Sequence, residues 1–206
     1  MAKYLSLVGL IGVINVIDAS PNVGLCEGSL LLGVRGVVSR IHRFLRMLCK
    51  DVELPKFVLE VLERKSGGGD LVAYLVELLG RELDPEDRTA FYVESSDWFW
   101  EEGIRLLDKG DYRQAGEKIW NSVVQAVKAV AERRGWRHDA HRLIWAALRR
   151  IAQETGDATY IRLFAEVEQL HQNFYEGHLD EYDVRILAES ARELRGKLLA
   201  LIQGRG

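Results

Sequence analysis

Apolar side chains recur at intervals of three or four positions through most of the chain after residue 55, with polar side chains between them. One such stripe runs from Ala115 to Val130, and another continues without interruption from Val184 to Leu201. This spacing places the apolar groups on one face of a helix. No segment in this part of the chain alternates apolar and polar positions as a half-buried strand does. The pattern therefore predicts an all-α fold.

Glycine and aspartate mark the ends of the predicted helices. Gly110-Asp111 and Gly156-Asp157 each combine a residue that suits a helix C-terminus with one that can cap the next N-terminus. Asp84-Pro85 is another start signal, because proline suits the first helical position. The three glycines of Ser66–Gly69 interrupt an earlier helix. The expected helices cover residues 56–65, 70–79, 85–109, 111–134, 139–154, 157–176 and 180–202.

The short connections between these helices predict the architecture. Helices that are joined by so few residues pack antiparallel to their neighbours in the chain. We therefore expect an up-and-down antiparallel helical bundle over residues 85–203. Residues 47–84 are expected to form short preceding helices that are separated by the glycine-rich break.

Residues 1–46 differ in composition from the rest, because they carry five basic and only two acidic side chains. They contain an apolar run, Leu5–Ile17, that is shorter than the roughly 20 residues of a membrane-spanning helix. Three interpretations stay open for this run: a secretory signal, a short buried strand or helix, and codons upstream of an authentic start at Met47. We expect residues 1–46 to be an atypical extension, either disordered or a misassigned start.

The overall composition bears on whether the protein spans a membrane, binds nucleic acid or forms disulfides. With 48% hydrophobic and 29% charged residues, the 206-residue chain resembles a globular protein that has no membrane span. Its net charge of −3 means that no whole-molecule field attracts nucleic acid, so any RNA contact has to be local. Only two cysteines are present, Cys26 and Cys49. Such sparse cysteine use favours free thiols in the cytoplasm over a disulfide.

Several motifs together resemble the PaREP family of archaeal helical proteins, over about residues 54–201. The resemblance is carried by Gly110-Asp111-Tyr112, Ala115–Trp120, Ala126–Ala129, Arg134-Gly135-Trp136, His141 and Leu170-His171-Gln172-Asn173-Phe174-Tyr175-Glu176. The bundle of that family is similar to the HEPN group, whose helical domains occur in nucleotide-binding modules and in toxin ribonucleases. The resemblance therefore implies a HEPN-like bundle that pairs as a homodimer.

The ribonuclease signature of the HEPN group is incomplete in this chain. Active members carry an arginine, four to six residues and a histidine on a late helix. At that place this chain has His171, six residues and His178, so a histidine replaces the arginine. Arg134 to His141 and Arg133 to His138 have the required spacing, but both pairs cross the helix break at Gly135. The resemblance therefore leaves catalysis open.

Two histidines occupy positions where a helical core favours apolar residues. His171 lies on the apolar stripe of its helix, and the plainer interpretation is a core histidine satisfied by a hydrogen bond. The functional interpretation is a polar pocket between facing helices that brings together His141, His171, Asn173 and Tyr175. Their imidazoles could then move protons in metal-independent RNA cleavage, with Arg134, Arg137 or Lys128 offsetting the phosphate charge. The catalytic candidates are His171, His141 and Arg134.

A basic stretch with interleaved tryptophans is a candidate surface for phosphates and bases. It contains Arg133, Arg134, Arg137, His138, Arg142, Arg149 and Arg150, together with Trp136 and Trp145. The plainer interpretation is a solvated face with ion pairs. The candidate binding residues are Lys128, Trp136, Arg137, His141, His171, Asn173 and Tyr175.

The sequence predicts no metal and no cofactor. His138 and His141 have the spacing of a metal pair, but no cysteine or clear carboxylate completes the set. The chain also has no glycine-rich phosphate loop and no nucleophile elbow.

The sequence therefore leads to a helical module that binds a protein or a nucleotide-containing partner such as RNA, and that self-associates. The alternative is a toxin-like endoribonuclease that uses histidine acid–base chemistry. A third hypothesis is a nucleotide-binding companion of a nucleotidyltransferase.

Overall fold

The computed structural model describes residues 54–204, and these residues form an all-α fold. The predictions for residues 1–46, for Met47 and for the two cysteines lie outside the described residues. The chain divides after Gly68 into two units, the first holding α3 and the second holding α4 to α9. The described helices are α3 (Lys56–Ser66), α4 (Leu71–Glu82), α5 (Pro85–Asp108), α6 (Tyr112–Arg133), α7 (His141–Thr155), α8 (Thr159–Glu176) and α9 (Glu181–Ile202).

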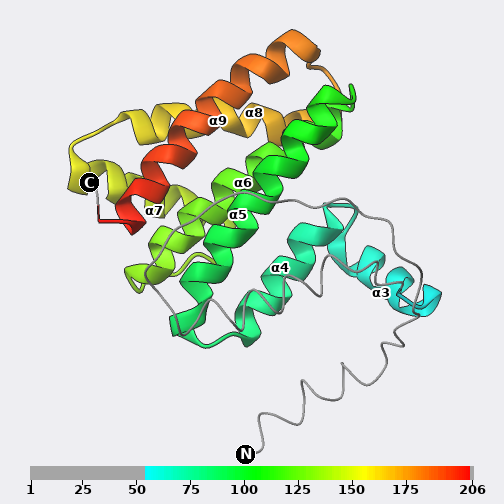
Figure 1. The fold of residues 1–206 in the computed structure, drawn as a ribbon, viewed down its shortest axis with the longest axis horizontal. Helices are drawn as coiled ribbons and strands as arrows, with labels where there is room; N and C mark the ends of the chain where they lie inside the picture. The colour runs from blue at the N-terminus through cyan, green and yellow to red at the C-terminus, as the bar shows by residue number, and fades with distance from the viewer. Residues whose placement is uncertain (1–53, 205–206) are drawn as a thin grey trace, which may run out of the picture. The chain divides into compact units, whose positions relative to one another are not determined.

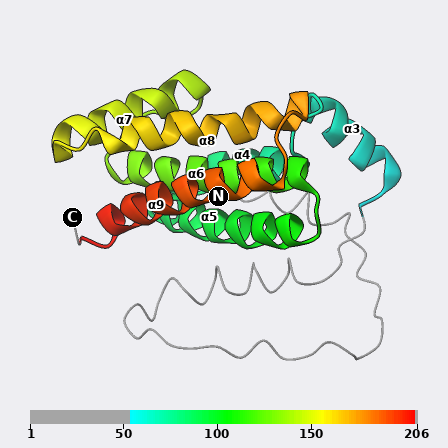
Figure 2. The ribbon, with the colours of Figure 1, turned by 90° about the horizontal axis from the view of Figure 1, so that it is seen from above.

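Helix α6 is the centre of the second unit. It packs against α5, α7, α8 and α9, and its residues from Ala115 to Ala131 are buried with the exception of Trp120. Figures 1 and 2 show α6 between α5 on one side and α8 on the other. Helix α9 packs along both α6 and α8, and α7 packs on α8. A bundle built around one central helix confirms the predicted fold class.

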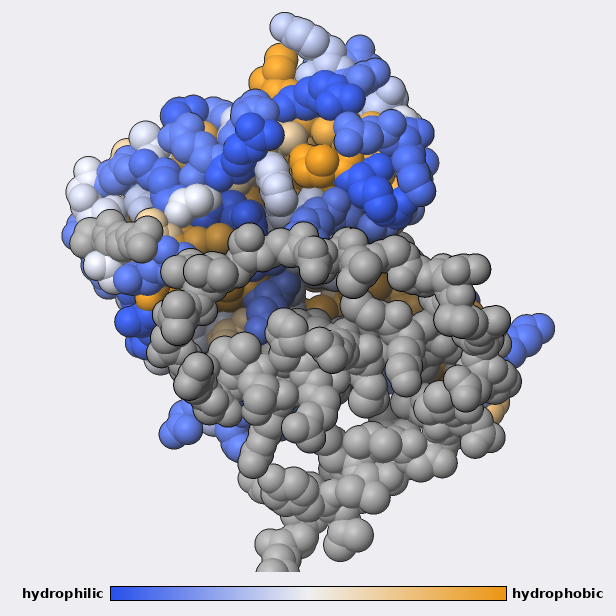
Figure 3. All heavy atoms as spheres, viewed as in Figure 1, coloured by the Kyte–Doolittle hydropathy of each residue, from blue (hydrophilic) through white to orange (hydrophobic). Residues whose placement is uncertain are grey.

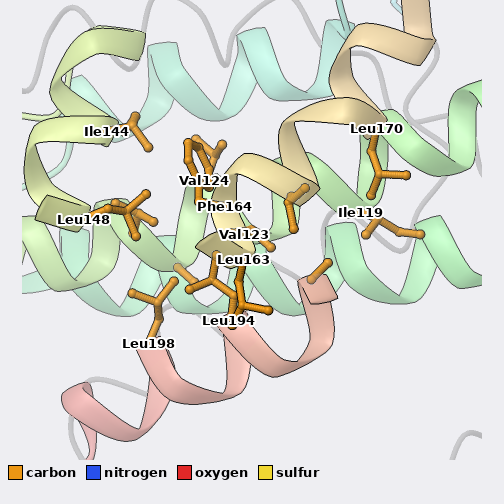
Figure 4. Packing of buried hydrophobic residues seen from close by; sticks show 14 of the residues in the cluster. Ile119, Val123, Val124, Ile144, Leu148, Leu163, Phe164, Leu170, Leu194 and Leu198 are labelled. Atoms are coloured by element: carbon orange, nitrogen blue, oxygen red, sulfur yellow. The ribbon is translucent and has the colours of Figure 1, made fainter. Parts of the chain in front are cut away.

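The hydrophobic core lies where α6, α7, α8 and α9 meet. Figure 4 shows the side chains of four helices pointing toward one another in this region. Ile119 and Val123 come from α6, Leu148 from α7, Phe164 from α8 and Leu194 from α9, and all five are fully buried. The apolar stripes of these helices therefore meet in one hydrophobic cluster. This cluster fixes the positions of α6, α7 and α8 relative to one another.

The predicted stop signals agree with the helix ends more closely than the predicted start signals do. Gly156 and Gly177 follow α7 and α8 in the left-handed conformation, with φ of 68° and 65°. Helix α7, however, begins at His141 with Ala140 in the N-cap position, so the prediction that Asp139 starts it was wrong. Asp139 lies before the helix and forms an ion pair with Arg137, at 3.1 Å between Oδ2 and Nη2.

The predicted end of α4 near Leu79 and Gly80 was also wrong. The helix continues through Gly80, which is buried, and ends at Glu82. A Cβ atom at Gly80 would lie only 2.7 Å from the hydroxyl oxygen of Tyr92 in α5. The missing side chain therefore allows Tyr92 to approach α4 closely.

Polar side chains dominate the visible surface of the described helices, with apolar side chains in smaller groups between them (Figure 3). Tyr182 and Ile186, which are four residues apart on α9, are among the exposed large apolar side chains. Within residues 54–204, no helix has the length and the apolar character that a membrane crossing requires.

Candidate functional site

The His171 side chain of α8 is held by a buried carboxylate of the central helix. Its Nδ1 lies 2.7 Å from Oε2 of Glu117, whose side chain is only 4% exposed. Because a carboxylate can only accept, Nδ1 carries the hydrogen and Nε2 is left as the second functional nitrogen. Nε2 forms no hydrogen bond with the described residues and is not sealed from solvent. The opposite oxygen of Glu117 accepts from the Asn121 amide at 3.3 Å.

Trp120 of α6 joins His171 to the second histidine. Its indole lies face to face with the His171 ring, with centroids 3.9 Å apart and an interplanar angle of 16°. Its Nε1 donates to Oε1 of Glu168 at 2.7 Å. The other oxygen of Glu168 lies 2.8 Å from Nε2 of His141, the first residue of α7. Each histidine is therefore held by its own glutamate, and Trp120 contacts both histidine–glutamate pairs.

The two imidazoles are close enough to act on one ligand. Their ring centroids are 6.4 Å apart, and Tyr175 meets the His171 ring edge-on at 5.3 Å. The His141 side chain is 49% exposed and the His171 side chain 25% exposed, so the group is open to solvent. We call this group the histidine cluster, and it consists of Glu117, Trp120, His141, Glu168, His171 and Tyr175.

The glutamates change the protonation of His171. Burial alone would lower the pKa of this imidazole, but the hydrogen bond and charge of Glu117, with the charge of Glu168, outweigh it. The pKa of His171 is therefore raised above its ordinary value of 6.5. Burial and then the Glu117 charge also raise the pKa of the Tyr175 hydroxyl. The two glutamates thus favour the cationic form of His171, and the Tyr175 phenol is favoured in its neutral form.

Asn173 does not belong to this group, although the sequence placed it there. Its side chain is fully buried, and its Oδ1 accepts from the backbone N–H of Leu179 at 2.7 Å. It therefore ties the connection after α8 back to that helix. One turn of an α-helix carries side chains in several directions, so Asn173 points away from the surface that His171 and Tyr175 share.

Arg134 and Lys128 form ion pairs outside the histidine cluster. Arg134 forms an ion pair with Glu154 and lies over the Trp136 ring, 5.1 Å from its centroid. Lys128 is buried and forms an ion pair with Glu77 of α4. Neither cation contacts the two histidines among the described residues, so the expectation that they offset charge there is not met by this geometry.

Arg137 and Trp136 also lie outside the histidine cluster, in the connection between α6 and α7. Arg137 is exposed and pairs with Asp139. The Trp136 ring carries a second guanidinium, that of Arg150, 5.3 Å from its centroid. Arg137 and Trp136 therefore belong to a different part of the surface from the histidine cluster.

A basic and aromatic surface follows His141 along α7. Arg142, Trp145 and Arg149 line a shallow pocket of about 260 Å³, and the Arg149 guanidinium lies 5.7 Å from the centroid of the Trp145 ring. Positions 141, 145 and 149 share one helix face, because they are four residues apart. Neither arginine pairs with a carboxylate among residues 54–204. We call Arg142, Trp145 and Arg149 the α7 surface.

Sequence reasoning missed the two glutamates and the central role of Trp120. Glu168 could have been found, because it precedes His171 by three residues and so shares its helix face. Glu117 gave no comparable signal, since it lies in a helix that is buried on nearly all sides. His178, the second histidine of the incomplete signature, lies 3.6 Å from Glu176 and takes no part in the cluster. Within the described part of the chain, no group of three or more His, Cys, Asp or Glu side chains is arranged to hold a metal ion.

Comparison with known proteins gives a family and one solved structure. The model of the archaeal PaREP1/PaREP8 family matches residues 91–195. A crystal structure of a protein from Sulfolobus solfataricus is similar with a TM-score of 0.45 and 23% identity, over 51% of this chain and 93% of that chain. No curated protein matches the sequence.

Proposed function

The chain belongs to the archaeal PaREP1/PaREP8 family, and we propose that it is a helical module that binds single-stranded RNA along α7. The single observation that carries this proposal is the α7 surface, where two arginines without carboxylate partners flank a tryptophan. Arginine binds phosphate and stacks on bases, and an aromatic ring accepts any base on its face. The net charge of −3 does not oppose this contact, because the cations are gathered on one helix face.

The histidine cluster extends the α7 surface at the N-terminal end of the helix. His141 precedes Arg142 directly and is half exposed, and the pKa of His171 next to it is raised by Glu117 and Glu168, which favours the cation. A strand that stacks on Trp145 and follows α7 would therefore bring a phosphate or ribose to the two imidazoles. This continuity favours an RNA partner over a protein partner for this face.

A binding measurement with a matched charge control tests the proposal. A fluorescein-labelled RNA of about 12 nucleotides should bind the full chain with an increase in anisotropy in EDTA. The double variant Arg142→Ala/Arg149→Ala should bind about tenfold more weakly. The control Arg162→Ala/Arg192→Ala removes the same charge from α8 and α9, where each arginine pairs with a helix neighbour. Equal binding by the two double variants, or no binding by the wild type at about 100 μM protein, would contradict the proposal.

A metal-independent endoribonuclease is the second candidate function, and the paired histidines favour it. Each imidazole has one nitrogen fixed by a glutamate and the other without a hydrogen bond among the described residues. His141 would accept the proton of a ribose 2′-hydroxyl while the 2′-oxygen bonds to phosphorus. His171, whose raised pKa favours the protonated form, would give its proton to the 5′-oxygen as the P–O5′ bond breaks.

The cleavage hypothesis makes its own distinct prediction. Incubation of RNA with the protein in EDTA should yield 2′,3′-cyclic phosphate ends, and DNA of the same sequence should stay intact because it lacks the 2′-hydroxyl. His141→Ala and His171→Ala should each abolish the products, whereas His178→Ala should not. If the wild-type protein binds the RNA and leaves it intact, the nuclease hypothesis is contradicted and the RNA-binding proposal is not.

Self-association is the other expectation that the family resemblance raised. Tyr182 and Ile186, 73% and 49% exposed, lie one turn apart on α9 and support an apolar contact between two copies. Sedimentation of the full chain at about 10 μM should give a dimer, and Ile186→Lys should convert it to a monomer. A wild-type monomer at that concentration would contradict this proposal.

A further inference from the structure

A second polar pocket, of about 330 Å³, lies apart from the histidine cluster and the α7 surface. It is lined by α4, α5, the end of α6 and residues 135–139. Its volume is at the lower limit for small-molecule sites. Among its lining residues are Gly80, Arg88, Tyr92, Glu132, Trp136 and His138, and we call it the Tyr92 pocket.

Tyr92 of α5 is a buried residue that lines this pocket. The residue is 98% buried with its ring edge-on to His138, at 5.3 Å between centroids, yet its hydroxyl forms no hydrogen bond with the described residues. Gly80 makes room for this hydroxyl, because a Cβ there would lie 2.7 Å from it. Burial and then the charges of Glu77 and Glu132 raise the pKa of Tyr92 to about 12, so the hydroxyl stays a neutral donor.

Glu132 positions two further groups that lack a partner. One of its oxygens accepts from Arg88 Nη1 at 3.1 Å, and the other lies 2.7 Å from His138 Nε2. Arg88 Nη2 donates to the backbone oxygen of Leu83 at 2.8 Å. Arg88 Nε and His138 Nδ1 are buried without a hydrogen bond to any described residue. Arg88 Nε–H is a donor, and His138 Nδ1 is an acceptor in the neutral ring because Nε2 donates to Glu132. Such unpaired buried groups raise the free energy of the folded protein, and a ligand that pairs with both would remove that cost.

The charges around the pocket indicate that its ligand is neutral. Glu77 pairs with Arg81 and Lys128, Glu132 with Arg88, and Arg137 with Asp139. With every carboxylate matched by a cation, little net field is left to attract an ion. The polar groups that remain without a partner among the described residues include Arg88 Nε, His138 Nδ1 and the Tyr92 hydroxyl.

We propose that the Tyr92 pocket binds a neutral planar heterocycle with an amide edge, of the size of a free nucleobase or nucleoside. The carbonyl of that edge accepts from Arg88 Nε, its N–H donates to His138 Nδ1, and a second polar atom meets the Tyr92 hydroxyl. Both nitrogens are buried in the structure, so binding in this way requires a small movement of the side chains that cover them. The side chains that line its rim from residues 135–139 include exposed Arg137 and Asp139.

The test uses uracil and hypoxanthine as probes, because both carry an N–H next to a C=O. Their binding to the full chain is followed by the indole N–H resonance of Trp136, assigned from Trp136→Phe. Both probes should shift this resonance at millimolar concentration, and 1,3-dimethyluracil, which has no N–H, should bind about tenfold more weakly.

Protein variants provide the second arm of the test. Tyr92→Phe keeps the ring and removes only the hydroxyl, and it should weaken uracil binding severalfold. Tyr175→Phe, the same change in the histidine cluster, should not, which separates this site from the proposed RNA site. The proposal is overturned if neither probe shifts the resonance at about 10 mM, if dimethyluracil binds as well as uracil, or if inorganic phosphate binds better than either.

Discussion

His171 of α8 and Trp120 of α6 lie in a parallel stack, 3.9 Å between ring centroids. The indole covers one face of the imidazole and at the same time donates to Glu168, which lies 2.8 Å from His141. One side chain of the central helix therefore fixes both the orientation of His171 and the position of the glutamate beside His141. The pKa of His171 depends on this arrangement and can be measured directly.

We expect Glu117→Gln to lower the pKa of His171. The amide cannot supply the negative charge that, together with the hydrogen bond, outweighs burial and raises this pKa in the wild type. A titration of the His171 Cε1–H resonance by NMR measures the change. Glu189→Gln, an exposed position that pairs with Arg192 on α9, serves as the control and should leave the pKa as it is. An unchanged His171 pKa in Glu117→Gln would show that the contact is not made in solution.

The same raised pKa predicts a pH dependence of stability. The folded protein binds the His171 proton more tightly than the unfolded chain, so this stabilisation is complete below the ordinary pKa of 6.5 and is lost as the pH rises through the folded pKa. The free energy of unfolding of the wild type relative to His171→Gln should therefore be larger at about pH 6 than at about pH 9. Urea denaturation at both values measures it, and a difference that grows with pH would contradict the assignment.

Two helical glycines should respond to alanine in opposite directions. A Cβ at Gly103 of α5 would lie 2.7 Å from Cγ1 and 3.1 Å from the backbone nitrogen of Ile119, so Gly103→Ala should cost about 1–3 kcal/mol. At Gly196 of α9 nothing lies within 4 Å, and Gly196→Ala should stabilise by roughly 0.5–1 kcal/mol. Thermal unfolding of both variants tests the close packing of α5 on α6. If Gly103→Ala leaves the free energy of unfolding unchanged, this packing is contradicted.

Asp70, the N-cap residue of α4, should be highly sensitive to substitution. Its Oδ1 caps the helix by accepting from Val72 and Ala73, and its Oδ2 lies 2.6 Å from the buried ammonium of Lys118. Asp70→Asn keeps the cap but leaves the Lys118 charge uncompensated, at a cost of about 3 kcal/mol. Asp70→Ala also loses the cap, which adds about 1 kcal/mol.

A double variant separates the two roles of Asp70. Lys118→Met removes the buried charge, so Asp70→Asn should cost much less in that background than in the wild type. Urea denaturation of the four proteins gives the coupling. Additive effects would mean that the ion pair does not contribute to stability.

The sequence predicted much of this fold because the helix ends and apolar stripes are local features. Gly156 and Gly177 end helices for reasons that lie within one turn of the chain. Gly80 could not be interpreted in this way, since its role depends on Tyr92, a residue of another helix. The start of α7 was predicted two residues too early, at about Asp139, because no side chain caps this helix and so no local signal marks its first residue.

The candidate site was predictable only in part. His141 and His171 stood out because each is a polar residue beside an apolar stripe, and the structure brings them together. Asn173 has the same appearance in the sequence, yet it binds the backbone of Leu179. Lys128 was an apparent cation for a phosphate, but its partner Glu77 lies 51 residues away in the chain. Pairings of this kind depend on tertiary packing, which local patterns do not encode.

The salt dependence of RNA binding tests the central claim most directly. For single strands, the slope of log K against log salt concentration changes by about 0.7 for each phosphate contact. If Arg142 and Arg149 each contact a phosphate, their double alanine variant should have a slope shallower by about 1.4 than the wild type, and Arg162→Ala/Arg192→Ala should keep the wild-type slope. Equal slopes in all three proteins would contradict the assignment of the α7 surface as the RNA-binding site.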